Sequence, residues 1–194
     1  MHYRNLEVIL NNAILRYTST AIIAIALLTG NSSAAELFKK GPSVFNYNFL
    51  ELKYIDADGA DGLGLVGSAD IRPNIALRVD YSKLEERGFD SDGLRLGATY
   101  YIQSKAYPQA DWNFAAGLDR VEDEGGIFLS AGTRYALNDV IELNASLTLA
   151  TVFDTDLTIS LAGFYELSPG LSAFVETDLG DGSAISLGAR FYWR

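Results

Sequence analysis

The stretch IELNASLTLA, residues 141–150, alternates apolar and polar side chains along its length. Successive side chains of an extended strand point to opposite faces, so this alternation predicts a β-strand with one apolar and one polar face. The apolar face carries Ile141, Leu143, Leu147 and Leu149, and the polar face carries Glu142, Asn144, Ser146 and Thr148. The architecture depends on which of the two faces meets water.

The same pattern recurs along the chain in segments of about ten residues, each followed by a turn. We predict ten strands, near residues 45–55, 62–71, 75–85, 93–102, 111–120, 127–137, 141–150, 157–167, 171–179 and 184–193. Neither a helical pattern nor a linker interrupts them, which predicts a single all-β domain. The segments at 62–71 and 111–120 alternate least clearly, so eight strands is the alternative count.

The polar face distinguishes two architectures. In a soluble barrel or sandwich the apolar face points inward, whereas in an outer-membrane barrel it meets lipid and the polar face fills the lumen. The polar face here mixes charges of both signs with glycine and serine, as a crowded interior would. Its charged residues are Glu51, Lys53, Asp70, Arg78, Asp80, Arg95, Asp119, Arg134, Glu142, Glu166, Glu176, Asp178 and Arg190. We therefore expect an antiparallel up-and-down transmembrane β-barrel, with these charges paired across its lumen through water.

The connections between strands predict an orientation. Tight turns around Pro73, Asn138 and Pro169 alternate with acidic segments such as DADGADG (56–62) and VEDEGG (121–126). Proline and asparagine preset turn geometry, and in outer-membrane barrels the short turns are periplasmic. We expect the proline turns at the periplasmic end and the acidic segments as extracellular loops.

Aromatic residues of the apolar face gather towards its two ends. Those towards the acidic segments are Tyr54 and Tyr81, and those towards the proline turns are Tyr100, Trp112, Tyr135, Tyr165 and Trp193. Aromatic rings with a polar edge prefer the headgroup layer of a membrane. We expect two interfacial belts, with outer-membrane lipid and lipopolysaccharide as neighbours.

The chain closes on SLGARFYWR, residues 186–194. The spacing of Ser186, Gly188, Phe191 and Trp193 resembles the C-terminal insertion signal of bacterial outer-membrane barrels. The resemblance, to small porin-like or OmpA-type barrels, implies that the barrel assembly machinery is a partner during insertion. Arg194 departs from the family pattern, since members commonly finish on the aromatic residue itself.

Residues 1–35 have a different character. Arg4 and Arg16 precede the apolar run AIIAIALL (21–28), and Ser33 and Ala35 are the small residues that a signal peptidase needs. This run is too short to span a bilayer, which takes about 20 residues. We expect a signal peptide cleaved before Glu36, so that residues 36–194 form the exported barrel domain.

The sequence offers little for catalysis, metal binding or cofactors. Its only histidine is His2, inside the predicted signal peptide, and it has no cysteine. Serine–histidine catalysis and thiolate chemistry are thereby excluded from the exported domain. In segment 56–62, Ala60 occupies a ligand position of a calcium loop, so that motif fails. The net charge of −10 argues against nucleic acid. We expect no enzyme, cofactor or metal site.

Three functions stay open for a barrel in the outer membrane of a Gram-negative bacterium. The main expectation is a narrow porin-like channel for ions or very small solutes, with an ion-paired lumen. The alternative is a closed structural barrel that supports the envelope or a partner. An outer-membrane enzyme comes third, because the histidine is missing. A monomer is the favoured oligomeric state.

The terminal signal can be tested by replacing both of its aromatic residues. Phe191→Ala combined with Trp193→Ala should slow assembly, because the last strand would lose its recognition face and an interfacial anchor. We expect the membrane-inserted fraction to fall several-fold, as measured by membrane fractionation and heat-modifiable gel migration. Unchanged levels would show that these aromatic residues are not read.

Overall fold

The computed structural model describes residues 38–39, 43–86, 89–180 and 183–193. The predicted signal peptide, its cleavage site and Arg194 lie outside the described residues. The chain divides into two units, Met1–Lys39 and Lys40–Arg194. In the first unit only the short strand β1 (Phe38–Lys39) is described, and the second unit holds all the other described strands.

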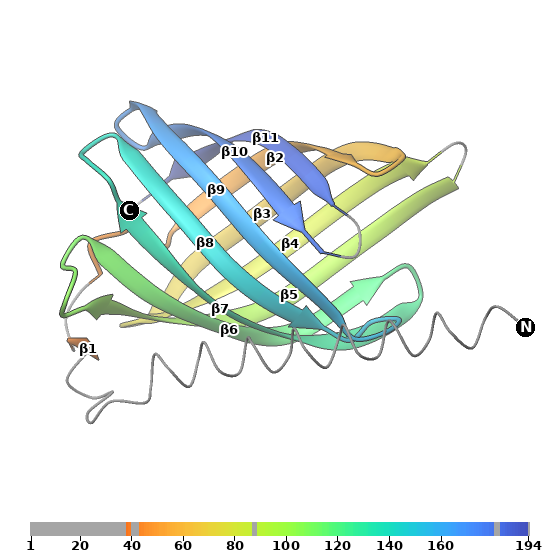
Figure 1. Cartoon of the computed structure of the whole chain (residues 1–194), viewed down its shortest axis with the longest axis horizontal. Helices are drawn as coiled ribbons and strands as arrows, with labels where there is room; N and C mark the ends of the chain where they lie inside the picture. Colours follow the sequence, from red (N-terminus) through yellow and green to blue (C-terminus); the bar gives the residue numbers. More distant parts are fainter. Residues whose placement is uncertain (1–37, 40–42, 87–88, 181–182, 194) are drawn as a thin grey trace, which may run out of the picture. The chain divides into compact units, whose positions relative to one another are not determined.

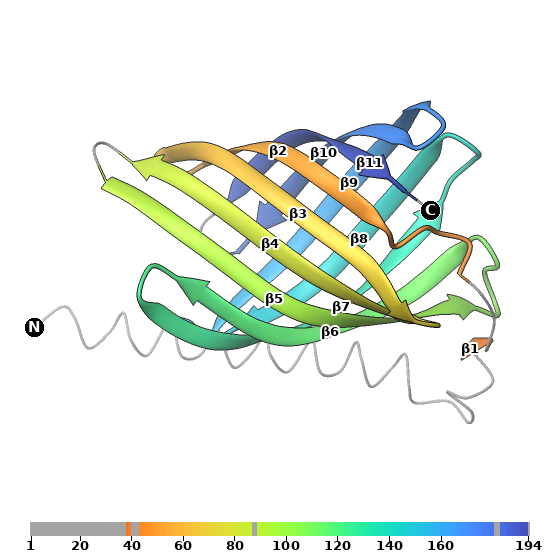
Figure 2. The same cartoon turned by 180° about the vertical axis from the view of Figure 1, so that it is seen from behind.

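Ten antiparallel strands of the second unit form a closed barrel (Figures 1 and 2). They are β2 (Phe49–Ala57), β3 (Ala60–Arg72), β4 (Ile75–Glu86), β5 (Phe89–Ser104), β6 (Ala110–Val121), β7 (Glu124–Ala136), β8 (Ile141–Ala150), β9 (Asp156–Ser168), β10 (Leu171–Leu179) and β11 (Ala184–Tyr192). Each strand pairs with the next in sequence, and β11 pairs with β2 to close the ring. The predicted all-β class and the count of ten strands are confirmed.

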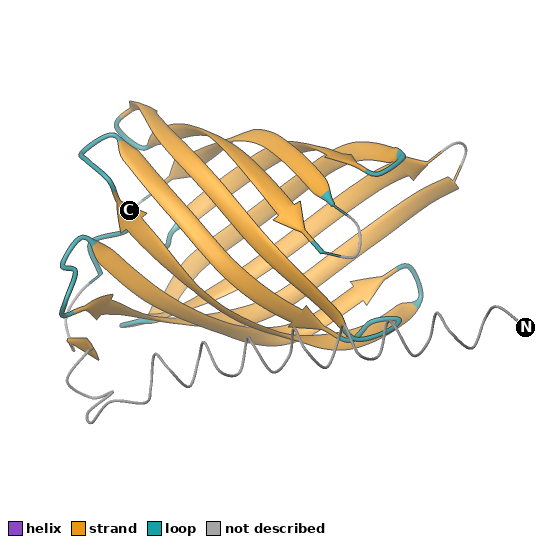
Figure 3. Cartoon of the chain, viewed as in Figure 1, coloured by secondary structure: helices purple, strands orange, loops and turns teal. Residues whose placement is uncertain are grey.

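Strands and short connections make up the whole described part of the second unit (Figure 3). Within the described residues, no helix is long and apolar enough to cross a membrane.

Among the described connections, two-residue turns join four of the strand pairs, and each contains one residue with positive φ. These residues are Gly59 (φ 88°), Asn74 (φ 66°), Glu122 (φ 55°) and Gly170 (φ 85°). Glycine and asparagine adopt this left-handed region readily, and the prolines before Asn74 and Gly170 fix the preceding φ. The tight turns at Pro73 and Pro169 are as predicted. The acidic segments 56–62 and 121–126 are mostly strand rather than loop, because turns this short let the ladder continue through them.

The first barrel strand begins at Phe49, later than the predicted start near residue 45. The pairings of β2 with β11 and with β3 both end at Phe49, opposite Tyr192 and Ser68. The physical reason is that the chain before Phe49 leaves the wall, because Tyr47 packs in the lumen against Tyr101. Residues 43–48, which we call the inner segment, instead lie at the end of the barrel where β2 begins, with Tyr47 only 4% exposed in the lumen and Val44 exposed. We call this end, which also holds the Pro73 and Pro169 turns, the tight-turn end; the two-residue turns at Gly59 and Glu122 lie at the opposite end.

The two faces of the barrel settle which architecture the alternation encodes. On β2, Glu51 is 1% exposed and points into the barrel, whereas its neighbour Leu52 is 57% exposed on the outside. The same holds around the ring, where leucine, isoleucine and valine side chains cover the outer surface. A water-soluble barrel would have the reverse arrangement. The outer face is therefore that of a barrel built to sit in lipid.

Charge on the outer face should destabilise the barrel according to depth. Leu96→Arg lies in the middle of β5 and should cost about 2–4 kcal/mol of unfolding free energy. Leu63→Arg is the matched control, because Leu63 pairs with the belt residue Tyr54 and should cost about 0–1 kcal/mol. Denaturant titration in lipid vesicles measures both values. Equal costs at the two positions would contradict the depth assignment.

Candidate functional site

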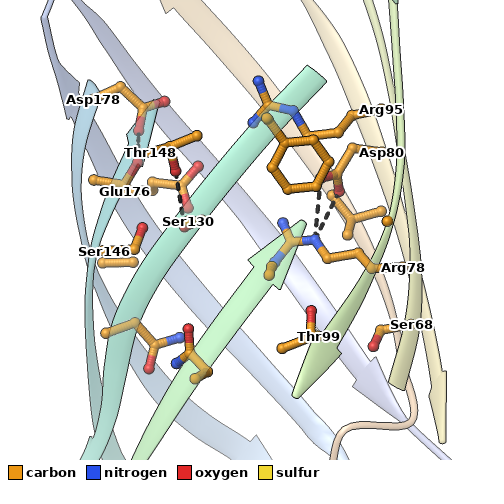
Figure 4. A pocket seen from close by; sticks show the side chains of 18 of the residues that line it. Ser68, Arg78, Asp80, Arg95, Thr99, Ser130, Ser146, Thr148, Glu176 and Asp178 are labelled. Atoms are coloured by element: carbon orange, nitrogen blue, oxygen red, sulfur yellow. Dashed lines mark hydrogen bonds and ion pairs between the residues drawn. The ribbon is translucent and has the colours of Figure 1, made fainter. Parts of the chain in front are cut away.

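A polar cavity of about 390 Å³ occupies the barrel lumen. Its charged lining residues are Lys53, Arg78, Arg95, Arg134, Arg190, Asp80, Asp119, Glu176 and Asp178. Figure 4 shows Arg78, Asp80 and Arg95 on one wall, and Glu176, Asp178 and the hydroxyl residues Ser130, Ser146 and Thr148 on the other. The lining thus offers charges of both signs together with neutral hydrogen-bonding groups.

The most buried charges form a network at the tight-turn end. Arg190 forms an ion pair with Glu51 at 2.8 Å, and a longer contact of 3.7 Å to Glu142. Arg134 donates from Nε and Nη2 to the two carboxylate oxygens of Glu142, both at 2.8 Å. Such a bidentate pair fixes geometry as well as neutralising charge. Four side chains from β2, β7, β8 and β11 are held together in this way.

Aromatic rings cover the guanidinium groups of this network. The Arg190 guanidinium carbon lies 3.9 Å from the ring centre of Phe164 and 4.2 Å from that of Phe49. The Arg134 guanidinium carbon lies 4.6 Å and 4.7 Å from the ring centres of Phe45 and Tyr47. A desolvated cation over an aromatic face gains about 2 kcal/mol or more. The rings therefore offset part of the cost of burying the two charges.

Charge pairs continue along the rest of the lumen. Lys53 contacts Glu176 at 2.6 Å, Arg78 contacts Asp80 at 3.1 Å, and Arg95 pairs with Asp119. Asp178 instead accepts a hydrogen bond from the Ser160 hydroxyl.

The expected pairing across the lumen through water is wrong for most of these groups. Arg78 and Asp80 belong to one strand, while Arg95–Asp119, Arg134–Glu142 and Arg190–Glu51 join neighbouring strands. Long side chains that lie along the wall reach a partner directly and keep their contacts with the wall. Among the ion pairs of the described residues, only the 3.7 Å contact of Arg190 with Glu142 reaches beyond the next two strands.

Two residues predicted for the charge network lie outside it. Asp70 is exposed at the tight-turn end, where it accepts hydrogen bonds from the Tyr101 hydroxyl and the Asn48 amide. Glu166 is exposed near the end of β9, and none of the ion pairs among the described residues includes it. Both have the correct strand parity, but they lie beyond the enclosed part of the lumen.

The inner segment packs against Tyr101 and Asp111, which were not among the predicted site residues. The Tyr47 ring stacks on Tyr101, with centres 3.7 Å apart and planes 4° apart. Its hydroxyl donates to Asp111 Oδ2 at 3.4 Å, and the Ser43 hydroxyl donates to the same oxygen. Burial away from water raises the pKa of the Tyr47 hydroxyl, so the group stays neutral. Asp111 is fully buried, and its Oδ1 atom has no hydrogen-bond partner among the described protein atoms.

Four lumen residues that were not among the predicted site residues share one feature of the sequence. Phe49, Phe128, Phe164 and Phe174 stand at polar-face positions in the alternation, and the structure buries all four inside the barrel. Three of these rings lie over an arginine of the lumen wall, as Phe128 does over Arg95 at 4.8 Å, and Phe174 stacks on Phe164. Asp111 has the same parity as Asp119 and so falls on the polar face, but it stands at the first position of a weakly alternating segment. Tyr47 precedes the first strand, so periodicity could not place it.

The predicted belt residues lie on the outer surface near the strand ends. Tyr54 donates from its hydroxyl to Asp61 at 3.1 Å, and Tyr81 donates to Asp92 at 2.8 Å. Tyr100, Tyr165 and Trp193 are exposed at the tight-turn end, and Trp112 and Tyr135 are half-buried there. Hydroxyls paired with acids beyond the apolar surface are consistent with rings at an interface.

The four residues of the terminal signal divide between the two faces of β11. Phe191 and Trp193 are exposed on the outside, while Ser186 is fully buried within the barrel. Gly188 has no room for a side chain, because a Cβ there would lie 2.3 Å from the Leu52 carbonyl oxygen and 2.7 Å from the Phe174 ring. The pattern that resembles an insertion signal therefore also satisfies the packing of the closing strand.

The described residues contain no group of three or more histidine, cysteine, aspartate or glutamate side chains arranged to hold a metal ion.

The buried network should carry a large share of the barrel's stability. Glu51→Ala leaves Arg190 buried with only the 3.7 Å contact to Glu142, and should cost about 3–5 kcal/mol of unfolding free energy. Asp123→Ala removes the exposed Arg120–Asp123 pair and should have no measurable effect. Urea titration of the refolded proteins compares the two. A small loss for Glu51→Ala would mean that water replaces the missing carboxylate.

Comparison with known proteins places the fold but no family. No protein family model and no curated protein matches the chain. Among solved structures, the NanC porin aligns with a TM-score of 0.53 at 10% identity, over 74% of this chain and 100% of that one. The KdgM porin in complex with disordered oligogalacturonate aligns with a TM-score of 0.51 at 9% identity, over 75% of this chain and 99% of that one. At such low identity, the likeness shows a shared porin-type barrel fold.

Proposed function

We propose that this chain is a narrow porin-like channel of a Gram-negative outer membrane, passing ions or very small solutes. The observation that carries the proposal is the lumen cavity of about 390 Å³, lined by paired charges and hydroxyl groups. Ion pairs can serve stability alone, but an unfilled polar space along the barrel is what a path for a small solute requires.

The size of the interior supports a small cargo. About eight strands enclose an interior just filled by side chains, whereas 16 to 18 leave an open aqueous channel. Ten strands lie close to the filled limit, and five basic side chains occupy part of the cavity wall. The cavity volume is near the lower end of the range of about 300–1,000 Å³ for small-molecule sites. Oligosaccharides and peptides in transit would need more room.

Charge supports a weak preference for cations. Inside the lumen, each arginine of the wall has an acidic partner, which limits the net field there. The end opposite the Pro73 and Pro169 turns exposes Asp56, Asp58, Asp61, Asp92, Glu122, Asp123, Glu124 and Asp154. Exposed acids at a channel mouth concentrate cations, most strongly at low salt.

The alternative is a closed structural barrel that supports the envelope or a partner. It is favoured by the packing of the tight-turn end, where the cavity stops at Tyr47 and the residues beyond it, such as Tyr101 and Asp111, are buried. In that case the charge network would serve stability alone.

The setting of the barrel belongs to the same proposal. The apolar outer face and the aromatic belts support insertion as a monomer among outer-membrane lipid and lipopolysaccharide. The outward pair Phe191 and Trp193 supports delivery by the barrel assembly machinery. Export would depend on the signal peptide predicted in residues 1–35.

Planar-bilayer recording of the refolded protein tests the proposed function. We expect small single-channel conductance, a weak cation preference that grows as salt is lowered, and no passage of sugars. Reversal potentials under a salt gradient give the selectivity. Large anion-selective channels would contradict the proposal, and silence at every salt concentration would replace it with the closed structural barrel.

A further inference from the structure

We propose that the inner segment, residues 43–48, is the size-limiting constriction of the channel, and that Tyr47 sets the limit. The inference rests on the proposed channel function. It assigns the size selectivity of the channel to the segment that precedes the first barrel strand. No strand of the wall needs to move for the constriction to change, since Tyr47 lies outside every strand.

The position of Tyr47 is the first support. The cavity is lined by Tyr47 and Phe49 at the tight-turn end and by Ser82, Gly93 and Val121 towards the opposite end. Beyond Tyr47 the structure has the buried residues Tyr101, Asp111 and Ala76. A solute that enters from the acidic end therefore meets the Tyr47 ring where the cavity stops.

The ring is clamped by the lumen wall. Tyr101 of β5 stacks on it at 3.7 Å, and the Arg134 guanidinium of β7 lies 4.7 Å from its centre. Arg134 is itself fixed by its two hydrogen bonds to Glu142. The constriction is thereby attached to the buried charge network.

The backbone around Tyr47 is anchored on both sides. The Asn46 side-chain amide donates to the Trp193 carbonyl oxygen at 2.8 Å, and Arg134 donates to the Asn46 carbonyl oxygen at 3.1 Å. The Trp193 backbone NH donates to the Asn48 carbonyl oxygen at 3.1 Å. Asn48 also exchanges hydrogen bonds with Asp70, at 2.8 Å and 3.2 Å. These contacts reach β3, β7 and the end of β11, so the segment is held as part of the barrel.

Asp111 supplies a second, electrical consequence. Its carboxylate lies behind Tyr47, fully buried, and one of its oxygens lacks a hydrogen-bond partner among the described residues. Removing the ring would bring water to this carboxylate. A hydrated negative charge at the narrowest point favours cations over anions.

Three variants test the constriction by single-channel recording, with a graded series of neutral polyethylene glycols as size probes. Tyr47→Ala should raise conductance at least twofold, admit larger polymers and strengthen the cation preference. Tyr47→Phe keeps the ring and should match the wild type. Tyr107→Ala removes an exposed tyrosine from a loop at the same end and should also match the wild type.

The outcomes separate this inference from the proposed function. Conductance and size limit unchanged in Tyr47→Ala, beside a conducting wild type, would overturn the constriction and leave the channel standing. A silent wild type with a conducting Tyr47→Ala would uphold the constriction and show a barrel closed by its own chain. Silence in both would overturn both. Equal gains in Tyr47→Phe and Tyr47→Ala would also overturn it, because ring size would then not matter. Heat-modifiable migration confirms folding, and Tyr47→Leu replaces any alanine variant that fails to fold.

Discussion

Closure of the backbone ladder between the first and last barrel strands is the constraint on which the rest of the structure depends. In lipid no backbone group of an edge strand could find a partner, so β11 must pair with β2 along its length. Closure fixes the perimeter and thus the small interior. The seam then constrains the side chains, since Arg190 and Glu51 face each other across it and form their ion pair inside. Gly188, opposite Lys53, lets the two backbones approach.

Alternation was sufficient to predict the strands and their faces, because lipid and lumen impose opposite demands on successive residues. Segments such as 141–150 and 171–179 match their strands end to end. Alternation did not predict the structure at the ends of the strands, where lipid and lumen no longer impose opposite demands on successive residues. Residues 45–48 continue an extended pattern, but Tyr47 packs inside the lumen and the pairing of β2 with both neighbours ends at Phe49. At the far ends of the strands, Asp70 and Glu166 keep the lumen parity without being enclosed.

The candidate site shows a similar division. The sequence indicated which charges point inward, but periodicity carries no information about which acid each base meets. The acidic partner of each basic residue depends on side-chain length and on the neighbouring aromatic rings, as for Arg190 between Phe49 and Phe164. The partners therefore lie along the wall more often than across it. Asp111 escaped notice because its burial comes from the inner segment, a contact between residues 64 or more positions apart in the chain.

Neutralising the lumen and narrowing it are done by the same residues. A buried arginine needs a carboxylate and gains from an aromatic face, and both are bulky. Arg134 takes its carboxylate from Glu142 on the wall but its rings, Phe45 and Tyr47, from the inner segment. The charge therefore gains its aromatic contacts only when the segment is folded into the barrel, and the segment is held there partly by that charge. In a barrel of this size, the carboxylates and aromatic rings that stabilise a buried arginine fill part of the lumen. The width of the open lumen therefore depends on how many charges the interior buries.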